Sequence, residues 1–356
     1  MLYIVSTTGK CNLSCTYCGG SVSESVMPSE VGYDVETLSA LVQKDDDATI
    51  AFYGGEPLLR LPLIQDMMDR VPAKRFVLQT NGLLLHRIPE SYLKRLDTIL
   101  VSLDGRPQLT DAHRGRGLQE KVMANVGKIS GGFSGDLVAR MTVTQDSDIY
   151  EDVTYLLSKG FDHVHWQLSA IWSPEGSWTD LPRWVEERYN PGITRLKEHW
   201  LREMAQGRVL GIVPFQGVMS RLRSGTTGLP CGAGRDAFAV TTDGWILACP
   251  IGPEYEWNRV ARLGEAEPAD LKDRLHIEGP CRTCDVADVC GGRCLFANRE
   301  GHWEQEQFDL VCRTVKHLVR EMMDALPTVD RLVADGVVTR ERLDYPPFNN
   351  TTEIVP

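Results

Sequence analysis

Ten cysteines constrain this chain more than any other feature, because all of them fall in two groups. Three lie close together at Cys11, Cys15 and Cys18, and the other seven lie between Cys231 and Cys312. No basic segment followed by an apolar stretch begins the chain, so we expect no secretory signal and a cytoplasmic location. Disulfides are disfavoured in that reducing compartment, so the clustered cysteines indicate two metal-bearing modules.

The composition is that of a globular protein, with 42% hydrophobic and 24% charged residues. The formal net charge is −11 and no long single-sign block carries it. A nucleic-acid partner normally needs a basic surface, so none is expected. No apolar run reaches the roughly 18 residues of a membrane span, so no membrane partner is expected either.

Short apolar segments alternate with amphipathic segments from residue 2 to about 170. The predicted strands are Leu2–Val5, Thr49–Tyr53, Arg75–Gln79, Thr98–Leu103, Leu137–Thr144 and His163–Leu168. The predicted helices between them are Val35–Val42, Leu61–Arg70, Glu90–Leu96, Leu118–Ile129 and Ile149–Lys159. Six βα repeats predict an α/β fold with a parallel sheet, arranged as a partial barrel whose strand-end loops carry the chemistry.

Three segments follow the predicted α/β region 1–170. Residues 171–230 form a bridging insert with a helix over Ile193–Met204, and its tryptophans either pack a helical layer or line a substrate groove. These tryptophans are Trp172, Trp178, Trp184 and Trp200. Residues 231–312 are rich in cysteine and glycine and are expected to fold only with their metals. Residues 313–356 continue a helix predicted over Glu304–Leu326 and end in a polar tail expected to be partly disordered.

The first three cysteines form a Cys-x3-Cys-x2-Cys motif directly after the first predicted strand. Zinc would need a fourth ligand, and no histidine or fourth cysteine lies nearby. A [4Fe-4S] cluster held by only three thiolates instead leaves one iron open to a small molecule. With Tyr17 before the last cysteine, the motif resembles the signature of the radical S-adenosylmethionine (radical SAM) family. That resemblance implies that SAM binds the open iron and is cleaved to a 5′-deoxyadenosyl radical.

Motifs after the later strands resemble the SAM pocket of the same family. Gly54-Gly55-Glu56-Pro57 would be an ordinary turn by itself, but it follows the second strand of a chain whose cysteine motif follows the first. The resemblance implies that the two glycines let the backbone approach the SAM ammonium and that Glu56 supplies its negative partner. The implied SAM-binding residues are Tyr17, Gly54, Gly55, Glu56, Asn81, Ser102, Asp104, Arg114, Arg140 and Leu168.

Individual roles follow from the same resemblance. Ser102 is expected near the ribose, and the backbone of Leu168 is expected near the adenine. Arg114 and Arg140 are expected to pair with the SAM carboxylate, with structural ion pairs as the alternative for both arginines.

The seven downstream cysteines follow a second family pattern. Cys231 precedes Gly244-x4-Cys249, and Cys281-x2-Cys284-x5-Cys290-x3-Cys294 precedes Cys312. This order resembles the SPASM extension, which holds two auxiliary [4Fe-4S] clusters; a pair of zinc knuckles is the alternative. The resemblance implies an outer cluster on Cys281, Cys284, Cys290 and Cys312. It implies an inner cluster on Cys231, Cys249 and Cys294, with an open iron or a non-cysteine fourth ligand, so that three [4Fe-4S] clusters use all ten thiols.

The combined resemblance implies an enzyme that abstracts hydrogen from a residue of a ribosomal precursor peptide, using an external electron donor. The pattern looks like an archaeal peptide-modifying branch, in which closure of aliphatic side chains into carbon rings is one product. The chain begins at the first strand, so leader recognition is expected from the insert, the tail or a separate leader-binding protein. Pro250 stands where sulfatase-maturing relatives carry an aspartate, which disfavours that activity.

Two other functions remain open from the sequence. One is a radical SAM enzyme acting on a small molecule or cofactor precursor, and the other is an iron–sulfur electron carrier, which would have no use for Gly54-Gly55-Glu56.

No general acid or base can be assigned. The candidates are Glu175, Asp180, Glu187, Tyr189, Asp236 and Asp243.

Overall fold

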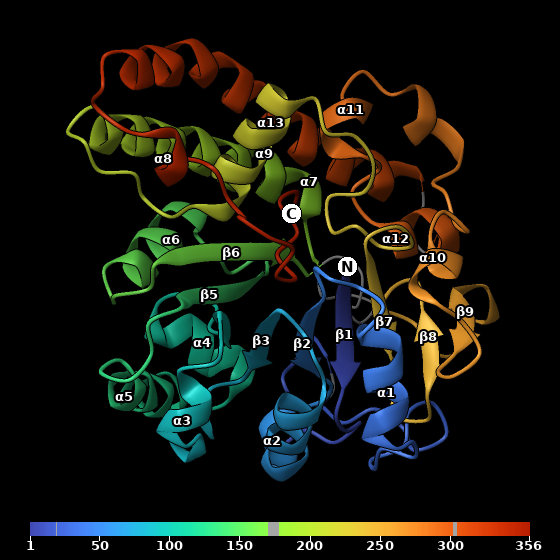
Figure 1. Cartoon of the computed structure of the whole chain (residues 1–356). Coiled ribbons are helices and arrows are strands. Elements are labelled where there is room, and N and C mark those ends of the chain that lie inside the picture. Colours follow the sequence, from blue (N-terminus) through green and yellow to red (C-terminus); the bar gives the residue numbers. More distant parts are fainter. Residues whose placement is uncertain (19, 170–177, 302–304) are drawn as a thin grey trace.

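A computed structural model describes residues 1–18, 20–169, 178–301 and 305–356 (Figure 1). Within these ranges the strands join one sheet in the order β6-β5-β4-β3-β2-β1-β7-β8-β9. The strands are β1 Leu2–Ser6, β2 Thr49–Tyr53, β3 Arg75–Thr80, β4 Thr98–Ser102, β5 Asp136–Val143, β6 His163–Leu168, β7 Ala237–Val240, β8 Trp245–Leu247 and β9 Arg259–Arg262. Strands β1 to β7 pair in parallel, and β8 and β9 are antiparallel. The predicted α/β class with a parallel sheet is therefore confirmed.

Strand β1 lies in the middle of the sheet because both of its faces are apolar. All five of its residues are buried. Alternate side chains point to opposite faces, so Tyr3 and Val5 join the large core under the helices. Leu2 and Ile4 join a smaller core on the inner face of the sheet. Burial on both faces is typical of a central parallel strand.

Helices α1 to α5 lie along the outside of the strands, and α8, α9 and α13 form a helical layer beside β6 (Figure 1). The helices are α1 Val35–Val42, α2 Leu61–Arg70, α3 Glu90–Leu93, α4 Pro107–Arg114, α5 Leu118–Ile129, α6 Ile149–Leu157, α7 Leu181–Trp184, α8 Asn190–Met204, α9 Val213–Ser224, α10 Pro268–Leu271, α11 Ala287–Cys290, α12 Leu295–Glu300 and α13 Gln305–Ala334. Helix α13 continues eight residues beyond the predicted end at Leu326, because its buried stripe runs on through Val329 and Leu332 despite Pro327. In the described part of the chain, no helix is long and apolar enough to cross a membrane.

The described tryptophans of the insert pack a helical layer. Trp184 and Trp200 are buried. The Trp184 ring lies 5.0 Å from that of Trp178, and the Trp200 ring lies 5.7 Å from that of Phe215. Trp172 lies outside the described residues. The groove-lining alternative therefore has no support from the three described tryptophans.

The C-terminal tail differs from the expectation of disorder. It runs from the helical layer into the centre of the molecule, where the C label stands in Figure 1. Thr352, Ile354 and Val355 are buried, and the last two belong to the large core. The tail is ordered because it carries its own apolar residues into that core.

The cysteine-rich region extends the main sheet instead of folding apart from it. Strand β7 pairs with β1 from Leu2↔Ala237 to Val5↔Val240. Strand β8 pairs antiparallel with β7 and with β9, and Gly244 adopts a φ of +85° in the turn between β7 and β8. The edge of β1 that a six-stranded partial barrel would leave open is thus covered by residues of the second cysteine group.

Candidate functional site

A cavity of about 330 Å³ brings the two groups of cysteines together. It lies against the inner face of the sheet, and Cys18 from the first group lines it. Cys231, Cys249 and Cys294 from the second group line it as well. These three are the cysteines that the sequence assigns to one set, although more than 60 residues separate the first from the last.

A second, smaller hollow of about 40 Å³ is lined by the other predicted set, Cys281, Cys284, Cys290 and Cys312. Four different elements carry these residues: a 3-10 turn at Gly279–Thr283, the loop after it, the end of α11, and α13. Cys294 also lines this hollow, so the two hollows share a wall. The structure thus gathers both predicted cysteine sets, each around its own space.

The buried thiols carry raised pKa values. Burial raises the pKa of Cys231 and of Cys312 to about 12 in each case, and neighbouring cysteines of the same set add to both increases. Burial also raises the pKa of Cys249, where Cys294 and Cys231 contribute further. A thiol binds metal as the thiolate, so metal binding at these residues would release protons.

The loop of the first three cysteines is held by Gly54 and Gly55. A Cβ added to Gly55 would lie 2.2 Å from the carbonyl oxygen of Lys10, and one added to Gly54 would lie 2.3 Å from that of Thr8. Gly54 also adopts a φ of +134°. The sequence predicted that these glycines make room for SAM, whereas the groups that approach them in the structure belong to the cysteine loop.

Glu56 is buried behind this loop and is bonded to the protein. Its carboxylate accepts hydrogen bonds from Leu58 N at 3.0 Å, Thr80 Oγ1 at 2.8 Å and Asn81 N at 2.8 Å. Burial raises the pKa of Glu56, and the three donors oppose that change. Asn81 in turn donates to Asn12 in the cysteine loop at 2.7 Å.

The predicted SAM-binding residues divide into two groups in space. Those that line the large cavity are Tyr17, Ser102, Arg114, Arg140 and Leu168. Those that do not line it are Gly54, Gly55, Glu56, Asn81 and Asp104. The second group supports the cysteine loop and the neighbouring strand ends.

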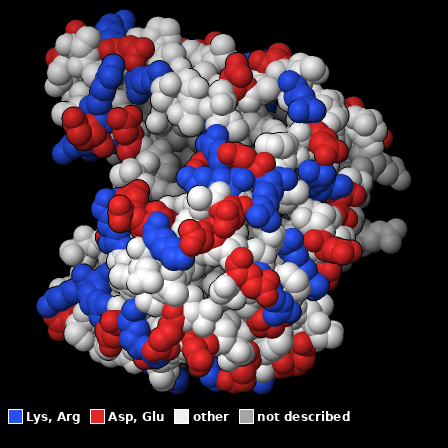
Figure 2. Space-filling view, turned by 45° about the vertical axis from the view of Figure 1, so that its right-hand side comes forward, with Lys and Arg blue, Asp and Glu red and all other residues white. Residues whose placement is uncertain are grey.

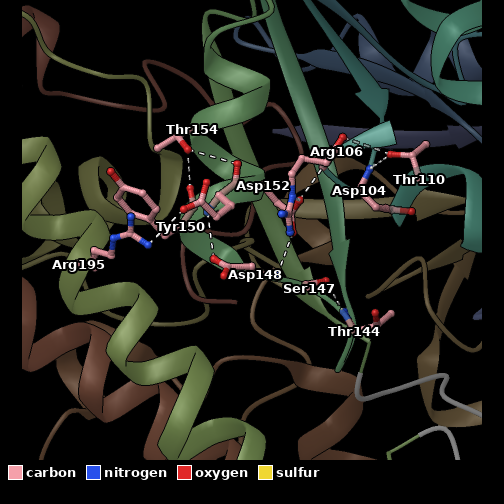
Figure 3. Close-up of polar contacts among 12 residues, drawn as sticks. Asp104, Arg106, Thr110, Thr144, Ser147, Asp148, Tyr150, Asp152, Thr154 and Arg195 are labelled. Atoms are coloured by element: carbon pink, nitrogen blue, oxygen red, sulfur yellow. Dashed lines mark hydrogen bonds and ion pairs between the residues drawn. The ribbon is translucent and has the colours of Figure 1, made fainter. Parts of the chain in front are cut away.

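Buried carboxylates organise the ends of β4 and β5 (Figure 3). Asp152 of α6 accepts hydrogen bonds from Arg106 N at 3.0 Å, Arg106 Nε at 2.8 Å and Asp148 N at 2.8 Å. Asp104 follows β4, and its backbone N–H donates to Thr110 Oγ1 at 3.1 Å. These contacts fix the first turns of α4 and α6 against the strand ends.

Arg140 has a partner that the sequence did not reveal. Its Nη2 lies 3.0 Å from Glu353 Oε2, and its Nη1 donates to the carbonyl of Thr351 at 3.0 Å. His165 Nε2 lies 2.5 Å from the carbonyl oxygen of Glu353. The pairing of Arg140 with a SAM carboxylate remains a prediction, and in the structure its guanidinium is paired with a carboxylate of the protein.

Glu353 is the one Asp or Glu among the described residues that line the large cavity. Burial alone would raise its pKa, but Arg140 and His165 outweigh burial and lower the pKa below its ordinary value. The side chain is therefore an anion at neutral pH. No motif points to it, because its position depends entirely on the path of the tail.

The five acid–base candidates that lie within the described residues do not line this cavity. Asp180 accepts from Arg183 N at the start of α7, and Glu187 pairs with Arg183. Tyr189 is buried and accepts from Trp166 Nε1 at 2.9 Å. Asp236 pairs with Arg235, and Asp243 accepts from Thr241. Glu175 lies outside the described residues.

Asn258 is a second site residue that the sequence did not indicate. It is fully buried, and its Oδ1 accepts from Cys249 N at 2.9 Å. Its Nδ2 donates to the carbonyls of Cys249, Ile251 and Gly252 at 2.9, 2.8 and 3.1 Å. One amide side chain therefore holds the cavity-lining loop that contains Cys249 and Pro250.

One face of the molecule carries mixed charge. On the face in Figure 2, lysines and arginines lie beside aspartates and glutamates rather than in one single-sign patch. A mixed surface of this kind gives no field that would attract a nucleic-acid backbone to that face.

Comparison with protein families identifies the first part of the chain. Residues 5–156 match the family model described as the Radical SAM superfamily. Over 360 residues the chain is 22% identical to the cysteine-type anaerobic sulfatase-maturating enzyme of Clostridium perfringens, covering 88% of this chain and 94% of that enzyme.

Two solved structures share the fold over most of the chain. Native anSMEcpe with bound AdoMet superposes with a TM-score of 0.72 at 19% identity, over 94% of this chain and 100% of that one. SuiB of Streptococcus suis bound to its precursor peptide SuiA superposes with a TM-score of 0.55 at 14% identity, over 82% of this chain and 71% of that one. The predicted fold class, a partial (β/α)6 barrel followed by a small cysteine-rich region, is confirmed.

Proposed function

From the radical SAM domain that residues 5–156 contain, we propose that the chain is an enzyme that modifies a ribosomally made precursor peptide. In this proposal the barrel, residues 1–170, binds SAM and one [4Fe-4S] cluster through Cys11, Cys15 and Cys18. The region 231–312 binds two auxiliary clusters through the cysteine sets that line the two hollows. When bound, SAM and its cluster supply a 5′-deoxyadenosyl radical that removes a hydrogen atom from the substrate.

The single observation that carries the proposal is the large cavity. Cys18 and the set Cys231, Cys249 and Cys294 line the same space, so a substrate between them would face both metal sites. An electron carrier needs no enclosed space for a substrate at that point. Relatives that include a sulfatase-maturating enzyme and a precursor-peptide complex support a peptide or protein as the substrate.

The chain's own residues would bind and shield the substrate residue. Leu2, Ile4, Tyr53 and Met141 give the cavity apolar walls, which exclude water from a reactive intermediate. Glu353 offers carboxylate oxygens that can accept a hydrogen bond from the substrate. The target residue is proposed to lose two hydrogens, one as an atom to the 5′-deoxyadenosyl radical and one as a proton, while the remaining electron would pass to an auxiliary cluster. The specific product would be an aliphatic side chain closed into a carbon ring.

Anaerobic reconstitution with SAM, dithionite and candidate precursor peptides tests this proposal. Formation of 5′-deoxyadenosine together with a mass loss of two hydrogens from the peptide is expected. Solvent deuterium uptake without a mass loss would indicate epimerisation instead of oxidation. Turnover of a small molecule, with no peptide modified, would overturn the peptide assignment, and absence of SAM cleavage would favour an electron carrier.

Iron analysis tests the two cysteine sets separately. Cys249→Ala and Cys312→Ala should each lower the iron content by about four atoms per chain, because each removes a ligand of a different cluster. Both variants should still cleave SAM without substrate, since the first cysteine group is intact. Equal iron in the wild type and both variants would contradict the assignment of these ligands.

A further inference from the structure

Asp104 does not line the cavity, and it gathers more donors than any ordinary surface carboxylate. It is fully buried, and each of its oxygens accepts two hydrogen bonds. Oδ2 accepts from Tyr17 Oη and Arg114 Nε, each at 2.8 Å. Oδ1 accepts from Arg114 Nη2 at 2.8 Å and from Thr142 N at 3.0 Å. Four donors fill the acceptor capacity of an ionised carboxylate.

The partners of Asp104 reach the cavity, while Asp104 itself does not. Tyr17, Arg114 and Thr142 all line the cavity. The Arg114 guanidinium also lies 5.4 Å from the centre of the Tyr17 ring, which adds a cation–π contact. The side chains of Tyr17 and Arg114, which line the cavity, are therefore both held by one carboxylate that does not line it.

The same contacts attach the cysteine loop to the barrel. Tyr17 stands between Cys15 and Cys18, and its neighbour Thr16 donates its N–H to the carbonyl of His113 at 3.0 Å. The Thr16 hydroxyl lies 2.9 Å from His113 Nδ1. The loop is thus held on α4 at Tyr17 and Thr16, and the Tyr17 contact depends on Asp104.

We propose that Asp104 is a positioning residue that holds Tyr17 and Arg114 in the cavity wall and, through Tyr17, fixes the loop carrying Cys15 and Cys18. The proposal rests on the proposed function, because that loop is taken to hold the cluster that binds SAM. The prediction that Asp104 touches SAM directly is the alternative to this positioning role. The consequence of the positioning role is that a change at Asp104 alters SAM binding without removing any group from the cavity.

The test compares holoprotein variants, reconstituted under anaerobic conditions, by their dissociation constants for SAM in equilibrium dialysis. Asp104→Asn places an NH₂ group against N–H and O–H donors, and we expect the dissociation constant to rise about tenfold or more. Tyr17→Phe removes one hydrogen bond and keeps the ring, so we expect a rise of about twofold to fivefold. The electron paramagnetic resonance spectrum of the reduced protein should lose its SAM-induced change in Asp104→Asn.

Asp152→Asn is the matched control. Asp152 is also fully buried and also accepts from an arginine Nε at 2.8 Å, but none of its contacts reaches the cysteine loop. We expect its dissociation constant for SAM to stay within about twofold of wild type, even if its thermal midpoint falls. If Asp152→Asn raised the dissociation constant for SAM as much as Asp104→Asn, the proposal would be overturned, because general destabilisation would then explain the weaker binding.

The remaining outcomes distinguish a failure of this proposal from a failure of the proposed function. Wild-type affinity in both Asp104→Asn and Tyr17→Phe would overturn the role of Asp104 and leave the proposed function intact. If Asp104→Asn does not fold, an unchanged affinity for SAM in Tyr17→Phe would overturn the role of Asp104. A wild-type holoprotein that binds iron at the first cysteines but no SAM would overturn both.

Discussion

Glu353 changes the chemistry of the cavity at the scale of a single residue. Arg140 is on β5, and the sequence alone left both a SAM carboxylate and a structural ion pair open as its partner. The tail brings Glu353 to the Arg140 guanidinium, so an ion pair occupies the wall. Charge on this wall is neutralised within the protein before any ligand arrives.

Replacing Glu353 by glutamine should lower the free energy of unfolding by about 2 kcal/mol. The amide can keep one hydrogen bond, but Arg140 then loses its counter-charge in a mostly buried site. Denaturant unfolding of the anaerobic holoprotein measures the change. Glu341→Gln is the control, because Glu341 is an exposed carboxylate of the same tail and should change stability by less than about 0.5 kcal/mol. Equal stability of Glu353→Gln and wild type would contradict the buried ion pair.

His165 should make stability depend on pH. Burial, together with the positive charge of Arg140, lowers the pKa of His165 to about 4, from 6.5 in the unfolded chain. Between pH 4 and pH 6.5 the unfolded chain binds more protons at His165 than the folded chain does. The stability that the neutral imidazole contributes is therefore complete above pH 6.5 and is lost as the pH falls toward 4. From pH 7.5 to 5.5 the loss should be about 1 kcal/mol.

Unfolding of wild type and His165→Gln at those two pH values measures this contribution. The variant should show a smaller loss on acidification, because it lacks the buried imidazole. His86→Gln, which changes an exposed histidine, should behave as wild type. An unchanged loss in His165→Gln would show that other groups cause the pH dependence.

At the scale of elements, helix α9 is shaped by the tail that crosses it. Gly217 lies in the middle of α9, where glycine is unfavourable for a helix. A Cβ at this position would lie 2.1 Å from Cγ2 of Ile354. Glycine is therefore the residue that lets the tail pack directly on the helix.

Gly217→Ala should destabilise the protein by about 1–3 kcal/mol, although helix propensity alone predicts a gain. The overlap with Ile354 outweighs the propensity. Gly127→Ala in α5 is the matched control, because a Cβ there meets nothing within 4 Å and should stabilise by up to about 1 kcal/mol. Thermal unfolding measures both changes. The double variant Gly217→Ala/Ile354→Ala should lose less stability than the sum of the losses in the two single variants. Additive losses would contradict the contact between Gly217 and Ile354.

At the scale of the whole molecule, the two cysteine groups belong to one continuous structure. Strand β7 covers β1, and the tail returns from the far end of the chain to β5 and β6. The cavity wall is therefore assembled from residues near both ends of the chain.

A fragment of residues 1–230 should consequently associate instead of remaining monomeric. Without β7, the apolar strand β1 would present an unpaired edge, which is a ready site for intermolecular pairing. Size-exclusion chromatography of the fragment beside the full chain measures this. A monomeric fragment that unfolds as cooperatively as the full chain would show that β7 is dispensable.

Much of the fold could be predicted from local pattern. The bounds of β2, β6, α1, α2 and α5 agree with the apolar periodicity, because each has its own buried stripe or face. The short strands β7 to β9 were missed, since three or four residues carry too little periodicity to be distinguished from loops. The tail was expected to be disordered because its polar residues dominate its composition, while its buried aliphatic residues, Val338, Leu343, Ile354 and Val355, are too scattered to form a pattern.

The sequence by itself determined the parallel sheet and the strand-end placement of the first cysteine motif, and a family resemblance implied the two sets among the other cysteines. Spacing and periodicity are local properties, and they can be read without knowing what lies nearby in space. Only the tertiary structure decided that Glu353 faces the cavity, that Arg140 is its partner and that Asp104 does not line the cavity. Those outcomes depend on contacts between residues up to 213 positions apart, and nothing in the local sequence specifies such contacts.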